Sequence, residues 1–327
     1  MSFVLGIDGG GTKTHAVIAT PDGAVLGFAT NGPSNWEMVG LRGAADSLGE
    51  AVAKAAAQAG CALTDITSTV FGLAGADWPS DVPRLEAAIE PIGIRGGQSI
   101  VNDSFIALRA GTPEPWGVVL IAGTGTVAAG RNRDGESYRT LGLGEMLGDW
   151  GSASDVSERA ITAVANEYTG RGPETVLTEQ LCRLAGVDSA AELLEQFSRG
   201  GEEAPSVAPL VLEAAAQGDT AAREIVERAG TELGDSAALV ARRLGLEPGY
   251  DLVLAGGLFR SDSALLEGLI SERAPGARLV RLIAPPVVGA VLMAMEFAGQ
   301  APGTDVQDRL SAELSEHFPE PPVPGIA

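Results

Sequence analysis

A strand that runs into a glycine turn occurs twice in this chain, and this repeat constrains the fold most. Residues 3–30 read FVLGIDGGGTKTHAVIATPDGAVLGFAT, and residues 118–137 read VVLIAGTGTVAAGRNRDGES. Each copy has an apolar strand, a glycine-threonine turn, a second strand and an Asp-Gly turn. Thr12 precedes Asp22 by ten residues, as Thr124 precedes Asp134. We interpret the repeat as an internal duplication of one strand–turn–strand unit, with chance similarity of two hairpins as the alternative.

The first glycine turn does not match the common phosphate-binding loops. A Walker A loop needs a glycine directly before Lys-Thr, where this chain has Thr12. A dinucleotide-binding turn opens a helix, whereas this turn opens the β-branched run 14–20. We therefore predict strands at 3–8, 14–20 and 24–30, joined first by a bend whose bare backbone admits a phosphate.

Several residues of the two turns are candidates for phosphate binding. Thr12 adds a hydroxyl and Lys13 a charge, and Asp8 is a candidate to hold Mg²⁺ through water. A plain hairpin turn is the alternative, but the second turn, GTGT at 123–126, favours phosphate. The candidates in the two turns are Asp8, Gly10, Gly11, Thr12, Lys13, Gly123 and Thr124.

Asp103 is the candidate catalytic base. It stands where the predicted strand QSIVN ends and the helix SFIALRAG begins. Asp103 would be an ordinary helix cap unless Ser104 fills that role and leaves the carboxylate available. In a kinase such a carboxylate accepts the proton of the attacking hydroxyl.

Three further loops carry polar groups that suit a sugar. Asn35 lies in GPSNWEMVG, Asp77 ends GLAGAD, and Asp149 lies in GLGEMLGDWGSASD. Each alone is explained by ordinary loop chemistry, but together they offer hydrogen-bond partners for several hydroxyls. Gly256 and Gly257 end the strand LVLAGG and would permit close approach of a flat base such as adenine.

Charge and composition exclude several function classes. The net charge is −21 with only two lysines, which argues against nucleic acid as a partner. Cys61 and Cys182 lack metal spacing, and only two histidines are present, so a zinc site or a histidine triad is not expected. No membrane-spanning run and no signal sequence are visible, so we expect a cytoplasmic protein without membrane contact.

The length suggests about two domains. GTPEPWG at 111–117 is the predicted hinge because two prolines and two glycines separate periodic segments. We predict one domain at 1–113 and a second at 114–327 with a helical insertion, whose C-terminal helix can pack back on the first. Apolar periodicity predicts a helix over 40–59, and a short helix near 81–91 is expected to be capped by Ser80 or Asp81.

The ordered set of motifs resembles the actin-like ATPase superfamily, and within it the BadF/BadG/BcrA/BcrD ATPase family with its N-acetylglucosamine kinases. GIDGGGTKT and LIAGTGTVAAG look like the two phosphate motifs, VNDSFIALRAG like the connecting motif, and LAGGLF like the adenosine motif. LGEMLGDWGSA resembles the family's Gly-Asp-Glu-Gly-Ser loop. The resemblance implies an α/β fold of two ribonuclease H-like lobes, with duplicated mixed sheets around an interdomain cleft.

The resemblance also implies roles for single residues. Asp103 would be the base for the 6-hydroxyl of an amino sugar, with ATP and Mg²⁺ as cofactors. The sugar would be bound by Asn35, Trp36, Gly75, Asp77, Asp103, Gly125, Asp149 and Ala153. Gly10, Gly11, Thr12, Thr124 and Gly257 would line the ATP, and a homodimer is expected.

Two positions depart from the family pattern. Trp150 stands where the loop has a glutamate, and Val127 stands where N-acetylglucosamine kinases commonly have an asparagine. These changes leave open which sugar is used, glucosamine and glucose included. An ATPase that activates a partner enzyme is the alternative, although Cys61 and Cys182 do not resemble the cluster-binding pair of such activators. A sugar sensor without activity is a third hypothesis.

Overall fold

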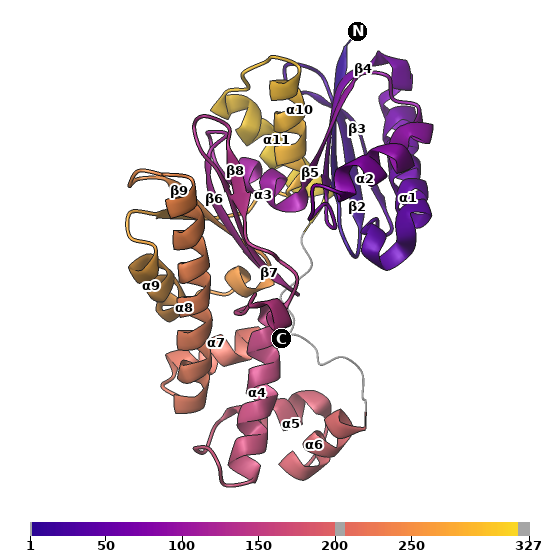
Figure 1. Cartoon of the computed structure of the whole chain (residues 1–327). Coiled ribbons are helices and arrows are strands. Elements are labelled where there is room, and N and C mark those ends of the chain that lie inside the picture. Colours follow the sequence, from indigo (N-terminus) through magenta and orange to yellow (C-terminus); the bar gives the residue numbers. More distant parts are fainter. Residues whose placement is uncertain (1, 200–206, 320–327) are drawn as a thin grey trace. The chain divides into compact units, whose positions relative to one another are not determined.

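The structure is a computed structural model that describes residues 2–199 and 207–319 (Figure 1). The chain forms two compact units. The first comprises the described parts of Met1–Val119, Gly130–Glu136 and Val280–Glu320. The second comprises the described parts of Leu120–Ala129 and Ser137–Leu279.

The first unit is built on a five-stranded mixed sheet of order β3-β2-β1-β4-β5. β1 is antiparallel to β2 and parallel to β4, and its register places Asp8 opposite His15. The three predicted opening strands are confirmed to within one residue. The strands are β1 (Phe3–Gly9), β2 (Thr14–Ala19), β3 (Val25–Asn31), β4 (Ile66–Leu73) and β5 (Gly97–Asn102).

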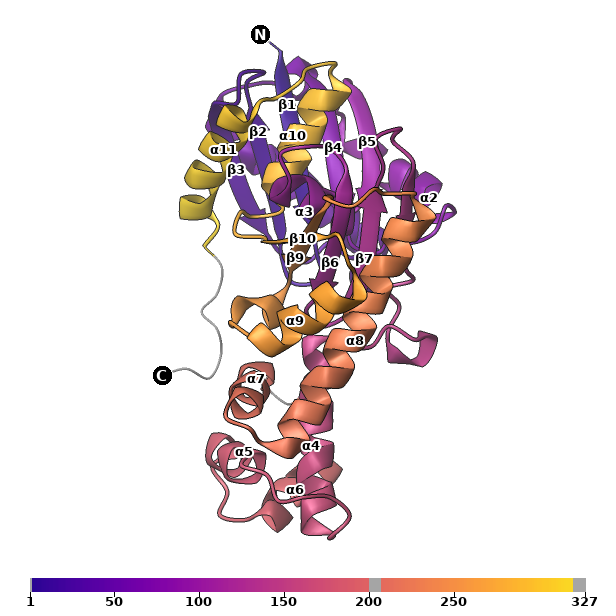
Figure 2. The same ribbon diagram turned by 90° about the vertical axis from the view of Figure 1, so that its left-hand side faces the viewer.

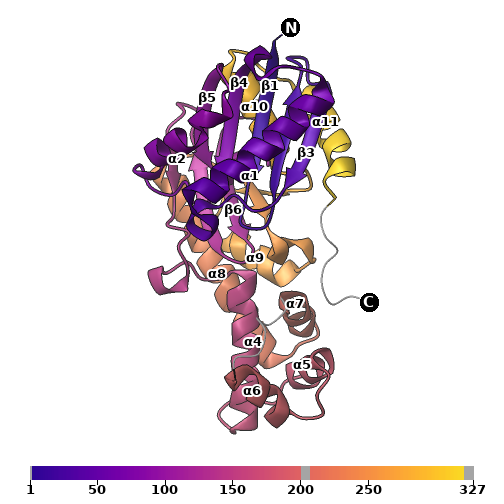
Figure 3. The same cartoon turned by 90° about the vertical axis from the view of Figure 1, so that its right-hand side faces the viewer.

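Two groups of helices cover the two faces of this sheet. Successive strand residues point to opposite faces, so Leu5 and Ile7 join one core and Val4 joins the other. Figure 3 shows α1 and α2 on one face, and Figure 2 shows α3, α10 and α11 on the other. The helices are α1 (Trp36–Ala59), α2 (Asp81–Ile89), α3 (Asp103–Gly111), α10 (Val287–Phe297) and α11 (Thr304–His317).

Helix α1 differs from the predicted helix at 40–59. It starts at Trp36, and Gly40 interrupts it with φ 73° and ψ 163°. The first turn is therefore a separate short piece, which periodicity alone does not reveal because it carries no apolar stripe of its own.

Glycines allow α10 to pack against its neighbours at backbone distance. A Cβ on Gly289 would lie 1.9 Å from the carbonyl oxygen of Ile106 in α3, and one on Gly6 would lie 2.5 Å from the backbone nitrogen of Val291. Real Cβ atoms do not approach that closely, so both positions require glycine. These contacts fix α3, which begins at Asp103, against α10 and thereby against β1.

A second sheet, most of which lies in the second unit, repeats the strand order of the first sheet. This second sheet is β10-β9-β6-β7-β8, and both sheets follow the order 3-2-1-4-5 when their strands are numbered along the chain. This shared order is what a duplicated unit produces, and it extends the similarity beyond two hairpins. The strands are β6 (Gly117–Ala122), β7 (Thr126–Arg131), β8 (Ser137–Arg139), β9 (Asp251–Ala255) and β10 (Arg278–Arg281).

Helices make up the rest of the second unit. The long helix α8 packs on α4, α7 and α9, and Gly230 and Gly234 let α9 approach it closely. Within the described residues, every helix is too short or too polar to cross a membrane. The helices are α4 (Ala153–Tyr168), α5 (Leu177–Ala185), α6 (Ala190–Ser198), α7 (Ala208–Ala216), α8 (Thr220–Arg243) and α9 (Ala264–Arg273).

Candidate active site

The first glycine turn joins β1 to β2 and is tied to the start of α1. The carbonyl oxygen of Gly10 accepts hydrogen bonds from the N–H groups of Ser34 and Asn35, at 3.0 and 3.1 Å. Gly11 is partly exposed, and Thr12 and Lys13 are exposed. The turn is therefore exposed while its base is fixed, and the Gly10 N–H is itself bonded to the Lys13 carbonyl oxygen at 3.0 Å.

Asp8 lies at the end of β1, directly before this turn. Its side chain is only 19% exposed, and burial together with the negative charge of Asp103 raises the pKa of Asp8 to about 7, against the opposing effect of Lys13. His15 lies 4.0 Å away, but burial lowers the pKa of His15 to about 4, so its ring is neutral near pH 7. The Asp8 carboxyl thus holds its proton unusually tightly, and a nearby cation would release it.

Asn35, Trp36 and Gly75 are brought together at the start of α1. Asn35 is the N-cap and accepts from the N–H of Glu37 at 3.0 Å. The indole Nε1 of Trp36 donates to the carbonyl oxygen of Gly75 at 2.7 Å. Gly75 has φ 83°, and a Cβ there would lie 2.7 Å from Asn35 Oδ1, so glycine keeps the amide in place.

Asp103 and Asp77 are joined through Asn102. Asn102 is the N-cap of α3, with Oδ1 accepting from the N–H of Ser104 at 3.1 Å, and its Nδ2 donates to Asp77 Oδ1 at 2.9 Å. Neither Asp103 nor Ser104 is the cap, so both capping predictions were wrong. Asn and Asp are equally good caps, and only the structure selects between neighbours. Asp103 is the first residue of α3 and is partly exposed, so its carboxylate is not sealed in the core.

The prediction for the cap of α2 is confirmed in position only. Ser80 occupies the N-cap position without a side-chain hydrogen bond. The carboxylate of Asp81 instead accepts from the N–H groups of Asp77 and Trp78, at 3.2 and 2.8 Å. Asp81 and Asn102 thus hold the backbone and the side chain of Asp77. The sequence analysis did not single out Asn102, and it named Asp81 only as a candidate cap of α2 and not as a support of Asp77.

The second glycine turn, between β6 and β7, is built like the first. The carbonyl oxygen of Gly123 accepts from the N–H of Ala153, the first residue of α4, at 2.9 Å. Thr124 and Gly125 are exposed, and Cβ atoms on Gly123 and Gly125 would meet none of the described atoms within 4 Å. In both units a helix start is therefore bonded to the first glycine of an open turn.

Asp149 closes the glycine-rich loop that precedes α4. Its Oδ2 accepts from the N–H of Leu143 at 2.8 Å. Gly142, Gly144, Gly148 and Gly151 all have positive φ, so the loop follows a path open to few other residues. Asp149 is partly buried and holds this path, which leaves its other carboxylate oxygen for a ligand.

The two departures from the family pattern border this loop. The guanidinium of Arg228 lies 4.8 Å from the centre of the Trp150 ring. Val127 packs against Gly142, where an added Cβ would lie 3.1 Å from Val127 Cβ. Both side chains therefore contribute to the packing of this loop.

Gly256 and Gly257 have different reasons to be glycine. A Cβ on Gly256 would lie 2.5 Å from the carbonyl oxygen of Ala122 in β6, and its φ is 96°. A Cβ on Gly257 would meet none of the described atoms within 4 Å. Packing explains Gly256, whereas only Gly257 offers a bare surface to a ligand.

No group of three or more His, Cys, Asp or Glu among the described residues is arranged to hold a metal ion by itself. Burial raises the pKa values of the thiols of Cys61, after α1, and of Cys182, in α5, which keeps both protonated near pH 7.

Comparisons with known proteins give the same family that the sequence motifs resemble. Residues 5–294 match the model of the BadF/BadG/BcrA/BcrD ATPase family. The chain is 31% identical over 301 residues to the N-acetylmuramic acid/N-acetylglucosamine kinase of Clostridium acetobutylicum, covering 90% of this chain and 98% of that protein. It is 31% identical over 309 residues to the N-acetyl-D-glucosamine kinase of Dictyostelium discoideum, covering 89% and 97%.

Solved structures agree on the fold. The ROK family glucokinase of Streptomyces griseus, solved with glucose and AMPPNP, superposes with a TM-score of 0.56 at 19% identity, over 90% of this chain and all of that one. A protein of Chromobacterium violaceum gives a TM-score of 0.67 at 24% identity, over 90% and 99%. The two mixed sheets therefore have the actin-like ATPase architecture. The chain belongs to the BadF/BadG/BcrA/BcrD ATPase family.

Proposed function

We propose that this protein is an ATP-dependent amino-sugar kinase that phosphorylates the 6-hydroxyl of N-acetylglucosamine. Two relatives at 31% identity over about nine tenths of the chain carry names of such kinases. The observation that carries the proposal is that the first unit contains both a partly exposed Asp103 and an exposed glycine turn. A sugar hydroxyl needs a base, and a γ-phosphate needs backbone donors.

The first unit would bind the sugar and activate its hydroxyl. The amide of Asn35 and the carboxylate of Asp77 offer an acceptor and donor set for ring hydroxyls, and Asn102 and Gly75 keep them in place. Asp103 would accept the proton of the 6-hydroxyl as its oxygen attacks the γ-phosphorus. A positioned base of this kind contributes about 10²–10⁴ in rate.

Residues of the second unit are proposed for the remaining roles. Thr124 and Gly125 are exposed and would contact phosphate oxygens, whereas the Gly123 N–H is already bonded to the Gly125 carbonyl oxygen at 2.9 Å. Gly257 would lie against a flat base. The loop fixed by Asp149, together with Ala153 at the start of α4, would complete sugar binding. The boundary of the two domains is proposed at residues 113 and 114, in the Pro-rich segment.

Mg²⁺ fits the chemistry of this chain through Asp8. The raised pKa of Asp8 leaves the carboxyl partly protonated near pH 7, and a dication beside it would favour the ionised form. The metal would neutralise charge on the β- and γ-phosphates. Gly10 and Gly11 would lie along those phosphates beside Asp8, and Lys13 adds a positive charge. A Cβ on Gly11 would lie 3.1 Å from Met38 Sδ, so a phosphate there would need that side chain to move.

A coupled assay of ADP release over a panel of sugars tests the proposal. The panel contains N-acetylglucosamine, N-acetylmuramic acid, N-acetylmannosamine, glucosamine and glucose, with phosphorus–proton correlation NMR to locate the new ester. We expect the highest kcat/KM for N-acetylglucosamine with phosphate on carbon 6. ATP hydrolysis that no sugar stimulates would refute the kinase and favour an activating ATPase. We also propose that the protein is cytoplasmic and forms a homodimer. Light scattering after size-exclusion chromatography tests the dimer.

A further inference from the structure

Three arginine side chains line one cavity of about 420 Å³ in the second unit. None of its lining residues is among those proposed above for sugar or ATP. Arg159 and Asn166 come from α4, Arg171 from the turn after it, and Glu224 and Arg228 from α8. Glu224 is the one carboxylate that lines the cavity, while Asp155 pairs with Arg159 and Glu145 interacts with Arg159 and Arg228 from outside it.

Within the part of the chain that the structure describes, Arg171 and Arg228 form no ion pair, although the carboxylate of Glu145 interacts electrostatically with Arg228. Arg171 donates from Nε to the Thr169 hydroxyl at 3.0 Å, and Arg228 stacks on Trp150. Glu224 precedes Arg228 by four residues on α8, a spacing that favours an ion pair, yet these two described residues form none. Arg159 does form an ion pair, because its Nε lies 2.6 Å from Asp155 Oδ1. The cavity therefore presents free guanidinium donors of Arg171 and Arg228 to an incoming anion.

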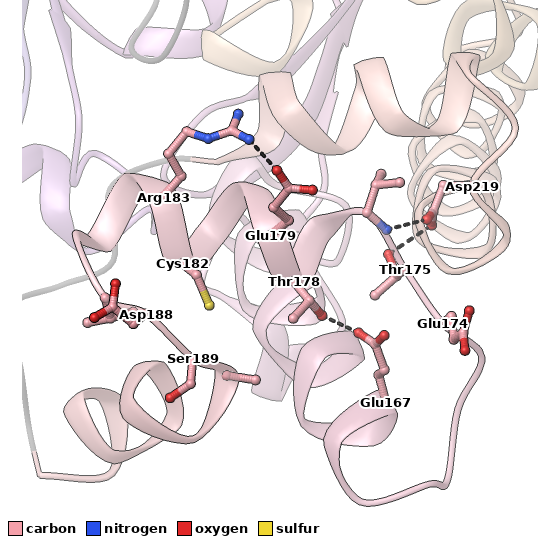
Figure 4. Close-up of a pocket in the computed structure, with 13 residues that line it drawn as sticks. Glu167, Glu174, Thr175, Thr178, Glu179, Cys182, Arg183, Asp188, Ser189 and Asp219 are labelled. Atoms are coloured by element: carbon pink, nitrogen blue, oxygen red, sulfur yellow. Dashed lines mark hydrogen bonds and ion pairs between the residues drawn. The ribbon is translucent and has the colours of Figure 1, made fainter.

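A second cavity, of about 700 Å³, is rich in carboxylates and not in arginines (Figure 4). It is lined by five carboxylates, and most of its polar groups satisfy one another. Asp219 accepts from the Thr175 hydroxyl and from the Val176 N–H, at 3.0 and 2.8 Å. Glu179 pairs with Arg183 at 2.5 Å. Arginines in this helical region are thus normally paired with carboxylates, and the arginine cavity is the exception.

We propose that the arginine cavity binds a phosphate group, either free or carried by a small metabolite. Guanidinium groups recognise phosphate oxygens with paired N–H donors, which favours phosphate over a monovalent anion. The volume exceeds that of a phosphate ion, and the amide of Asn166 offers a partner for a hydroxyl on the attached group. The ligand is therefore a small phosphorylated metabolite or inorganic phosphate.

The cavity is connected to the loop that carries Asp149. Arg228 stacks on Trp150 of that loop. The carboxylate of Asp155, which pairs with Arg159, also accepts from the N–H of Gly151 at 2.9 Å. An anion that draws either guanidinium toward itself would shift residues 150 and 151. The cavity is thus an effector site that acts on the loop, and its binding step does not depend on the proposed kinase activity.

Calorimetric titration of the full chain tests this proposal. The probes are inorganic phosphate, glucose 6-phosphate and adenosine monophosphate, at constant ionic strength. Arg171→Gln removes a cavity arginine, and Arg183→Gln is the matched control because it removes an exposed, paired arginine of α5. We expect saturable binding of at least one probe, at least tenfold weaker in Arg171→Gln and unchanged in Arg183→Gln, with a change in tryptophan emission. The tightest probe identifies the source of the phosphate.

Two results would overturn it. One is the absence of saturable binding for all three probes. The other is equal affinity in wild type and Arg171→Gln, which would place the bound phosphate elsewhere, such as at the glycine turns.

Discussion

Asp8 should make the protein less stable as the pH rises, and the effect can be calculated. Its pKa lies at about 7 in the folded protein, against an ordinary value of 3.8. Burial is the largest cause and the charge of Asp103 is the second. Because the folded pKa is raised, the stabilising contribution is complete below pH 3.8 and is lost as the pH rises to about 7.

The size of this loss follows from the difference between the two pKa values. About three pH units at about 1.4 kcal/mol each give about 4 kcal/mol when Asp8 is fully ionised. The side chain is 19% exposed, so solvent screening reduces this only in part. That loss is a large share of the ~5–15 kcal/mol by which domains are stable.

Asp8→Asn removes the titration while preserving the shape of the side chain. In magnesium-free urea unfolding followed by circular dichroism, the variant should gain stability over wild type by about 3 kcal/mol more at pH 8 than at pH 5. Asp46→Asn, at an exposed position of α1, is the control for removing a carboxylate from the first unit. If plots of the free energy of unfolding against pH are parallel for wild type and Asp8→Asn, the argument is refuted, because Asp8 would then titrate normally in the folded state.

Three further substitutions test how single residues are held within each unit. Gly289→Ala places a Cβ 1.9 Å from a backbone oxygen of α3 and should lower the free energy of unfolding by about 1–3 kcal/mol, whereas Gly268→Ala, with open space, should not destabilise α9 in the same melts. Asp149→Ala removes the acceptor for the Leu143 N–H and should raise the KM for the sugar at least tenfold, with Asp149→Asn close to wild type if the loop bond is what matters. Asn102→Ala removes the α3 cap and should lower both the free energy of unfolding, by about 1–2 kcal/mol, and kcat; an unchanged kcat would contradict its positioning role.

Local sequence signals predicted much of the fold. The duplicated strands around the turns at Gly11 and Gly125 follow from apolar runs that end in glycine, and the structure has them with matching strand order. The loop before α4 was predicted because four glycines interrupt it, and all four have positive φ. In each case the information lies within about ten residues of the chain.

What the sequence did not reveal depends on residues far apart. Arg109 in α3 pairs at 2.7 Å with Glu296 in α10, a contact across 187 residues that fixes the helix behind Asp103. The pKa of Asp8 depends on burial by neighbours that no spacing encodes. The choice of Asn102 as the cap of α3 also required the structure, because three consecutive residues had suitable side chains. The roles assigned to the site residues stay predictions.

The central claim is that Asp103 deprotonates the sugar, and Asp103→Asn tests it most directly. The α3 cap belongs to Asn102 and is left intact, so the helix and the turn beside it should keep their structure. Turnover with N-acetylglucosamine should fall at least a hundredfold (about 10²–10⁴ for a positioned base), while the Kd for ATP stays within about threefold of wild type by calorimetry. Near-normal turnover in Asp103→Asn would contradict the account.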